Sequence, residues 1–185
     1  PLSQTMCPPL YMPGEKQNMP STSVTTPPMK LLNAQLQNLF GGEAGVELHF
    51  AIKPEVVNSH GPVLLQVLLN LISNAIKFTK PDVAPIVQIK TEILKGEDIE
   101  QEGLDNHKEY CKITVNDNGI GFDQQYADKI FELFQRLHTR NEYQGTGIGL
   151  AVCKKIVDKH NGTINVSSKI NEGTLFTIIL PINQD

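Results

Sequence analysis

The feature that most constrains the fold is the segment from Val63 to Thr79, VLLQVLLNLISNAIKFT, which lies between Pro62 and Pro81. Proline is tolerated in the first turn of a helix and disfavoured inside it, so the two prolines predict the ends of one long helix. At about 100° per residue its apolar side chains cover an arc of roughly 200°, and its polar side chains share one narrow stripe. Such a helix must be largely buried. The polar stripe consists of Gln66, Asn70, Asn74 and Lys77.

The composition of this stripe leaves two interpretations open. A stripe that faces water usually carries pairs of opposite charges four residues apart, whereas this one offers two asparagines and one lysine. Amide oxygens are ligands for a hard cation such as Mg²⁺, and an ammonium group binds an anion. The stripe is therefore either an ordinary solvated face or part of a site for magnesium bound to phosphate.

The elements around this helix predict the fold class. Strands follow strands at both ends of the chain, with few strand–helix–strand alternations, which favours an α+β two-layer sandwich: a mixed sheet covered on one face by helices. Periodicity and turn residues predict strands over 46–52, 86–94, 110–117, 163–168 and 174–181, and further helices over 29–40, 124–134 and 150–160.

The remaining segments define the domain organisation. Residues 1–28 hold seven of the twelve prolines and show no apolar period, so they are interpreted as a proline-rich linker or tail. Residues 29–185 are long enough for one domain. The acidic segment 95–109 is predicted to be a solvated hairpin loop.

Composition excludes several classes of function. With 16 basic and 20 acidic residues, a net charge of −4 creates no positive field for nucleic acid or an anionic membrane. No apolar run approaches the ~20 residues of a membrane span. The three cysteines, Cys7, Cys111 and Cys153, suggest neither a disulfide framework nor a zinc site, and we expect Cys111 and Cys153 to be core residues. The expected location is cytoplasmic, with no direct membrane contact and no nucleic acid partner.

The segment VNDNGIGFD ends a predicted strand at Asp117 and continues with Gly119 and Gly121. An ionised aspartate only accepts hydrogen bonds, which suits an exocyclic amine such as that of adenine and disfavours phosphate. The glycines allow positive φ and close approach of a flat ring. Because Asp-Asn-Gly is also common in ordinary turns, the pattern alone leaves both interpretations open.

The segment QGTGIGL, residues 144–150, precedes a predicted helix. It lacks the G-x-G-x-x-G spacing of a dinucleotide fingerprint and the Gly-Lys-Ser/Thr of a Walker loop. Its backbone N–H groups at a helix N-terminus remain suited to phosphate. The polar segment 135–144 before it is predicted to be a mobile cover, to which Arg136 and Arg140 would add positive charge.

Five motifs in this order, NLISNAIKF, DNGIG, IFELFQR, GTGIGL and EGTLFTIILP, closely resemble the catalytic ATP-binding domain of sensor histidine kinases. That family belongs to the superfamily shared with DNA gyrase, the Hsp90 chaperone and the MutL repair ATPase, and the match covers about residues 29–181. The resemblance implies a Bergerat fold with ATP between the long helix and a flexible lid.

The resemblance also implies roles for individual residues around the phosphates. Asn74 would ligate the magnesium ion with Asn70 assisting, Lys77 would contact the phosphate chain, and Arg136 would lie near the γ-phosphate. These four residues are the expected catalytic set. The lid would close over the phosphates with Gly145, Thr146, Gly147, Ile148, Gly149 and Leu150.

Around the adenine, the resemblance implies that Asp117 binds the amino group directly and that Thr174 helps through water. Phe78 would lie against the base, and Gly119 and Gly121 would shape the pocket and the first hinge of the lid. The remaining two candidates would wall the base or anchor the lid, or else serve only as core residues; these are Ile130 and Phe134. The last motif has Asn171 where the family frequently has glycine, which leaves the backbone contact of that position open.

The fate of the phosphate depends on a base. Hydrolysing branches of the superfamily have a glutamate one turn before the magnesium asparagine, whereas this chain has Asn70, which cannot take a proton. We therefore expect slow hydrolysis and transfer of the γ-phosphate to an external acceptor. The five histidines lack the sequence context of the family's phosphorylated histidine; they are His49, His60, His107, His138 and His160.

The resemblance implies partners outside this chain. The acceptor histidine would lie on an upstream dimerisation domain of a longer, homodimeric protein, and a response regulator receiver domain would take the phosphate from it. Two alternatives remain: a serine kinase of the anti-sigma-factor type, and a catalytically inactive nucleotide-binding regulatory module. The upstream sequence would separate the first from a histidine kinase, and phosphate transfer would separate the second.

Overall fold

The computed structural model describes residues 34, 47–51, 54–94, 104–105, 107–135 and 146–182. The expected linker over 1–28 and most of the acidic segment 95–109 lie outside these residues, as does the expected helix over 29–40 apart from Ala34, which is helical. Among the described helices, none is long and apolar enough to cross a membrane. The described elements are β1 (Glu47–Ala51), α2 (Pro54–Lys77), β2 (Ile86–Leu94), β3 (Tyr110–Asp117), the 3₁₀ helices η2 (Gln124–Tyr126) and η3 (Lys129–Phe131), α3 (Gly149–Lys159), β4 (Thr163–Lys169) and β5 (Gly173–Pro181).

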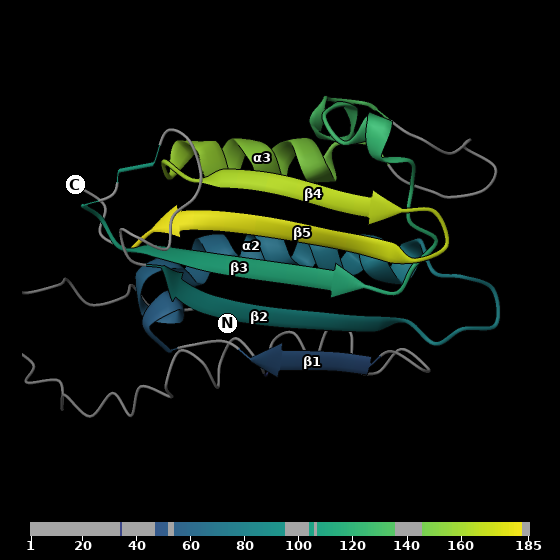
Figure 1. The fold of residues 1–185 in the computed structure, drawn as a ribbon, viewed down its shortest axis with the longest axis horizontal. Helices are drawn as coiled ribbons and strands as arrows, with labels where there is room; N and C mark the ends of the chain where they lie inside the picture. The colour runs from purple at the N-terminus through teal and green to yellow at the C-terminus, as the bar shows by residue number, and fades with distance from the viewer. Residues whose placement is uncertain are drawn as a thin grey trace, which may run out of the picture.

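Five strands form one mixed sheet in the order β1-β2-β3-β5-β4. β1 pairs with β2 in parallel, and the other neighbours are antiparallel. Figure 1 shows α2 and α3 on the same face of this sheet, where they contact each other and the strands. The predicted α+β two-layer arrangement, with helices on one face of a mixed sheet, is confirmed.

The core lies between the sheet and the two helices. Alternate residues of β3 point into it, so Cys111, Ile113 and Val115 are buried while Asn116 is exposed. Helix α2 contributes most of the opposing apolar surface, through Leu64, Val67, Leu68, Leu71, Ile72 and Ala75. Cys111 and Cys153 are both core residues, as predicted, and burial raises the pKa of each thiol to about 12. Both therefore stay neutral and act as small apolar side chains.

Two helix predictions need correction. Helix α2 begins at Pro54 rather than near Pro62, which lies inside the helix. A proline at the first helical position loses no hydrogen bond, so Pro54 fits this start, whereas the apolar pattern favoured the proline nearer to it. The predicted helix over 124–134 is instead the two short elements η2 and η3.

The apolar residues of segment 124–134 explain this second error. They recur three and four positions apart, the spacing of one helical face, which is why the sequence predicts a helix there. Ile130 is buried and Phe131 is half-buried with its ring edge-on to Phe176, but Leu133 and Phe134 are 61% and 70% exposed. Phe134 also has φ of 64°, a left-handed conformation that a continuous helix does not contain.

Candidate functional site

A row of side chains crosses the helix-covered face at one end of the sheet. Asp117 of β3 lies opposite Thr174 of β5, and Thr174 lies opposite Ser168 of β4. Cross-strand partners point to the same face, so these three polar side chains are neighbours. The C-terminus of α2 reaches the same end of the sheet, because the Ile120 N–H donates to the Phe78 carbonyl at 2.9 Å. Asp117 and the end of the long helix therefore share one region.

The carboxyl of Asp117 is held by backbone donors on one of its two oxygens. The N–H groups of Gly119 and Thr174 donate to Oδ1 at 2.8 and 3.1 Å. No described residue donates a hydrogen bond to Oδ2. Burial raises the pKa of Asp117 above its usual value, although the two N–H groups and the charge of Lys80 partly offset this effect. A half-buried carboxyl with a raised pKa and one oxygen that accepts no hydrogen bond from a described residue is typical of a binding residue.

The polar stripe of α2 reaches from this region to the start of α3. Asn70 donates from Nδ2 to the Gln66 carbonyl at 3.1 Å, which leaves its Oδ1 as the outward-facing atom. That oxygen would lie 3.1 Å from a Cβ built on Gly149, the first residue of α3. Asn74 follows one turn later, is half-buried, and receives no side-chain hydrogen bond from a described residue. Two amide groups thus lie between Gly149 and Phe78, and such oxygens fit a hard cation.

Lys77 and Phe78 lie together at the end of the stripe. The Lys77 ammonium is 4.4 Å from the centroid of the Phe78 ring, a cation–π contact. Both side chains are half-buried. Their predicted contacts, Lys77 with phosphate and Phe78 with adenine, remain predictions.

The glycine-rich segment begins α3. Gly147 has φ of 70°, and its carbonyl accepts a hydrogen bond from the Phe134 N–H at 3.0 Å. Thr146 is exposed, and Ile148 occupies the N-cap without a side-chain hydrogen bond to the helix. Leu150 packs against the core. Among the described residues, no side chain is seen to cap the start of α3, which suits a helix terminus that binds an anion.

The structure does not place every predicted site residue at this site. Arg136 and Gly145 lie outside the described residues. Ile130 is a buried core residue. The exposure of the Phe134 side chain excludes a core role. Its backbone N–H instead hydrogen-bonds to the Gly147 carbonyl.

The β4–β5 turn packs directly on the loop after Asp117. A Cβ built on Gly121 would lie 2.0 Å from the Lys169 carbonyl oxygen, and one on Gly173 would lie 2.0 Å from the Asp117 carbonyl oxygen. Asn171 adopts φ of 64°, which asparagine tolerates, and its N–H donates to the Ile120 carbonyl at 2.7 Å. The backbone of Asn171 therefore contacts the loop after Asp117 directly.

Gly173→Ala is expected to destabilise the protein by about 2–3 kcal/mol, because Gly173 has φ of 111° and the added methyl would overlap the Asp117 carbonyl. The melting temperature should fall by roughly 5–10 °C. The control is Glu172→Ala, which removes only an exposed ion pair with Lys169 and should change stability by less than about 0.5 kcal/mol. Equal melting temperatures for the two variants would contradict the assigned contact.

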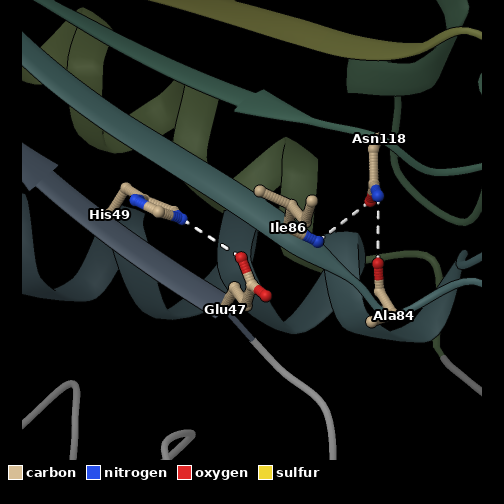
Figure 2. Close-up of polar contacts among 5 residues, drawn as sticks. All are labelled: Glu47, His49, Ala84, Ile86 and Asn118. Atoms are coloured by element: carbon tan, nitrogen blue, oxygen red, sulfur yellow. Dashed lines mark hydrogen bonds and ion pairs between the residues drawn. The ribbon is translucent and has the colours of Figure 1, made fainter.

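Sequence reasoning missed three polar residues that hold this region. Figure 2 shows one of them, Asn118, which accepts from the Ile86 N–H at 2.9 Å and donates to the Ala84 carbonyl at 3.0 Å. Its amide fixes the start of β2 beside Asp117. The other two, Gln124 and Ser168, hydrogen-bond to each other across the sheet edge. The dipeptide Asn118-Gly119 predicts a turn. No sequence pattern, however, predicts hydrogen bonds between residues as distant in the chain as Gln124 and Ser168.

Figure 2 also shows His49 and Glu47 paired at 3.4 Å on the edge strand β1. Both side chains are exposed. His49 is therefore a surface residue.

An amide-bearing helix, a half-buried carboxyl and a glycine-rich helix start are the features expected of an ATP-binding domain with the Bergerat fold. Residues 60–184 match the family described as "Histidine kinase-, DNA gyrase B-, and HSP90-like ATPase", and the chain belongs to this family. It is the ATP-binding catalytic domain of the histidine kinase type, as the motifs predicted.

Two relatives illustrate the similarity. "Cyanobacterial phytochrome A" of Nostoc sp. is 46% identical over 119 residues, 64% of this chain and 14% of that protein. "Phytochrome-like protein Cph1" of Synechocystis sp. is 41% identical over 140 residues, 76% of this chain and 17% of that protein. The chain thus spans a small part of the length of these relatives.

Solved structures agree on the fold. A catalytic domain of histidine kinase ThkA superimposes with a TM-score of 0.60 at 26% identity, covering 83% of this chain and 91% of that one. Full-length ShkA in complex with AMPPNP gives a TM-score of 0.59 at 24% identity, covering 83% of this chain and 29% of that one.

Proposed function

We propose that this domain binds Mg-ATP between α2, the start of α3 and the Asp117 end of the sheet, and transfers the γ-phosphate to a histidine outside this chain. The observation that carries this proposal is that the polar stripe of α2 extends from the start of α3 to the loop after Asp117. Asn70 Oδ1 faces Gly149 at one end, and the Phe78 carbonyl holds the loop after Asp117 at the other. One helix thus connects a phosphate-type site with an amine-type site.

At the phosphate end, Asn74 and Asn70 would hold the magnesium ion by their amide oxygens. When bound, the ion would neutralise negative charge on the phosphates. The Asn70 nitrogen is already bonded to the Gln66 carbonyl, which keeps its oxygen outward. Lys77 and Arg136 would bind the phosphate chain by charge, together with the backbone N–H groups of 145–150.

At the base end, the open Oδ2 of Asp117 would accept a hydrogen bond from the adenine amine. Thr174 would assist beside it, and Phe78 would pack on the ring. Gly119 lies so close to the Phe78 carbonyl that a Cβ there would approach it to 2.6 Å, so this wall of the pocket is closed by backbone. Gly121 would complete the pocket.

The reaction proposed is transfer rather than hydrolysis. An amide at Asn70 cannot take a proton from water, so no base is supplied at that position. The domain would orient the γ-phosphate for a histidine nitrogen, which forms the new N–P bond as the bond to the β-phosphate oxygen breaks. That histidine would lie on a dimerisation domain of a longer homodimeric protein, and a receiver-domain aspartate would accept the phosphate next. The similarity to the catalytic domain of histidine kinase ThkA supports this proposal, as does the small share of the two phytochromes' length that the chain spans.

The test mixes this chain with γ-labelled ATP, Mg²⁺ and a histidine-containing dimerisation domain from the same longer protein. Label that is lost in acid and stable in base is the expected result, because it indicates phosphohistidine. Acid-stable label on a serine would instead favour the anti-sigma-factor type of kinase. Magnesium-dependent ATP binding without any transfer would favour a regulatory module.

A further inference from the structure

Two buried hydroxyl groups extend the row that begins at Asp117. Thr174 and Ser168 are each 8% exposed, and their hydroxyl oxygens lie 3.0 Å apart. The distance alone does not say which of them donates. The other contacts of Ser168 decide this question.

Ser168 Oγ has three polar neighbours. The Phe122 N–H donates to it at 2.9 Å, and Oγ itself donates to the Gly173 carbonyl at 3.0 Å. A carbonyl only accepts, so the single hydroxyl proton of Ser168 is used in that bond. The hydrogen bond between the hydroxyls must then run from Thr174 to Ser168. As a result, Thr174 presents only lone pairs to any other partner.

The position of Ser168 is fixed by a second side chain. Gln124 donates from Nε2 to the Val166 carbonyl at 3.0 Å and accepts from the Ser168 N–H at 2.8 Å. Its carboxamide therefore takes the place of a neighbouring strand along β4, which is one of the two edge strands of the sheet in Figure 1. With both its backbone and its hydroxyl held, Ser168 keeps the Thr174 proton turned away from Asp117.

We propose that Ser168 is a specificity-determining positioning residue: it makes Thr174 an obligate acceptor beside Asp117, so that the site selects a base with an exocyclic amine. This inference rests on the proposed function. Cross-strand neighbours have Cβ atoms about 4.5–5.5 Å apart, a spacing at which the two hydrogens of one amine reach both acceptors. Adenine offers that amine. Hypoxanthine, the base of inosine triphosphate, has a carbonyl oxygen there, which both acceptors repel.

The test compares the Kd values of ATP and inosine triphosphate for the intact chain. The wild type should prefer ATP. Ser168→Ala frees the Thr174 hydroxyl to turn and donate to the carbonyl, so the preference should fall by about fivefold, the worth of one neutral hydrogen bond. Ser168→Thr keeps the hydroxyl and should therefore keep the wild-type preference for ATP. Ser167→Ala, a neighbour on the exposed face of β4, should leave both Kd values unchanged.

The same substitution made in a Thr174→Val variant distinguishes a positioning role of Ser168 from a general loss of structure at the site. In Thr174→Val no hydroxyl is left to direct, so adding Ser168→Ala should produce no further change in the ratio. An equal loss of affinity for both nucleotides in Ser168→Ala, or the same change of ratio in the Thr174→Val background, would overturn the role of Ser168 alone. Failure of the wild type to bind ATP would overturn the proposed function and this inference with it.

Discussion

Asn74→Asp is expected to lower phosphate transfer from ATP by at least about 100-fold. The substitution places a carboxylate where an amide oxygen is proposed to bind the metal, and it adds a negative charge beside the phosphates. Asn74 is half-buried on α2 and has no side-chain hydrogen bond from a described residue, so the change breaks no contact within the described protein. The measurement is the rate of label transfer at saturating Mg²⁺, together with the Kd of ATP with and without the ion.

The matched control makes the same chemical change elsewhere. Asn165 is exposed on β4 and faces away from the helices, so Asn165→Asp should alter the transfer rate by less than about twofold. Both variants should melt close to the wild type. Undiminished transfer by Asn74→Asp would contradict the proposed metal ligand, whereas equal losses in both variants would indicate a general effect of charge.

The strands were the most predictable part of this fold. β2 and β3 have the bounds that alternation predicted, since each strand buries every second residue and meets water with the others. β3 shows why: Cys111, Ile113 and Val115 point into the core, and the same alternation brings Asp117 onto that face. The register that sets Asp117 opposite Thr174 lay beyond the sequence pattern, because it depends on pairing between distant segments.

The helix predictions were correct for the two helices that cover the sheet, apart from the start of α2, and wrong for segment 124–134. α3 lies within a residue of its predicted span, and α2 ends as expected, but its start depended on a choice between Pro54 and Pro62. Local pattern cannot make that choice when both prolines precede the apolar run. The segment around Ile130 has the apolar spacing of a helix, but only Ile130 and Phe131 pack against the core, and Phe134 adopts a left-handed conformation that ends any helix.

The candidate site was likewise predictable only in part. Its chemistry was readable from residue types at short spacing, such as Asn70 and Asn74 one helical turn apart. The residues that hold it in shape were not, because Gln124 and Ser168 are 44 positions apart in the chain and meet only once the sheet has formed. Arg136 and Gly145, outside the described residues, remain predictions from the motifs alone.

Asp117→Asn is expected to weaken ATP binding by about 10–100-fold without destabilising the protein at neutral pH. The asparagine oxygen can still accept from Gly119 and Thr174, so the loop keeps its shape. Its NH₂ group, however, would face the adenine amine with a donor in place of the open carboxylate oxygen, and a charge-assisted hydrogen bond is lost. Calorimetric titration with ATP measures the first effect and chemical denaturation the second.

The pH dependence separates a binding role of Asp117 from a structural one. Burial raises its pKa in the folded protein above the 3.8 of an unperturbed carboxyl, so folding favours the protonated form. Below about pH 4 the group is protonated in both states; as the pH rises through the raised pKa, the wild type loses stability that Asp117→Asn keeps. The variant should therefore gain stability relative to the wild type from about pH 4 to pH 7. A relative loss over that range, or unchanged ATP affinity, would contradict the view that this carboxylate is retained for the base at a cost to the fold.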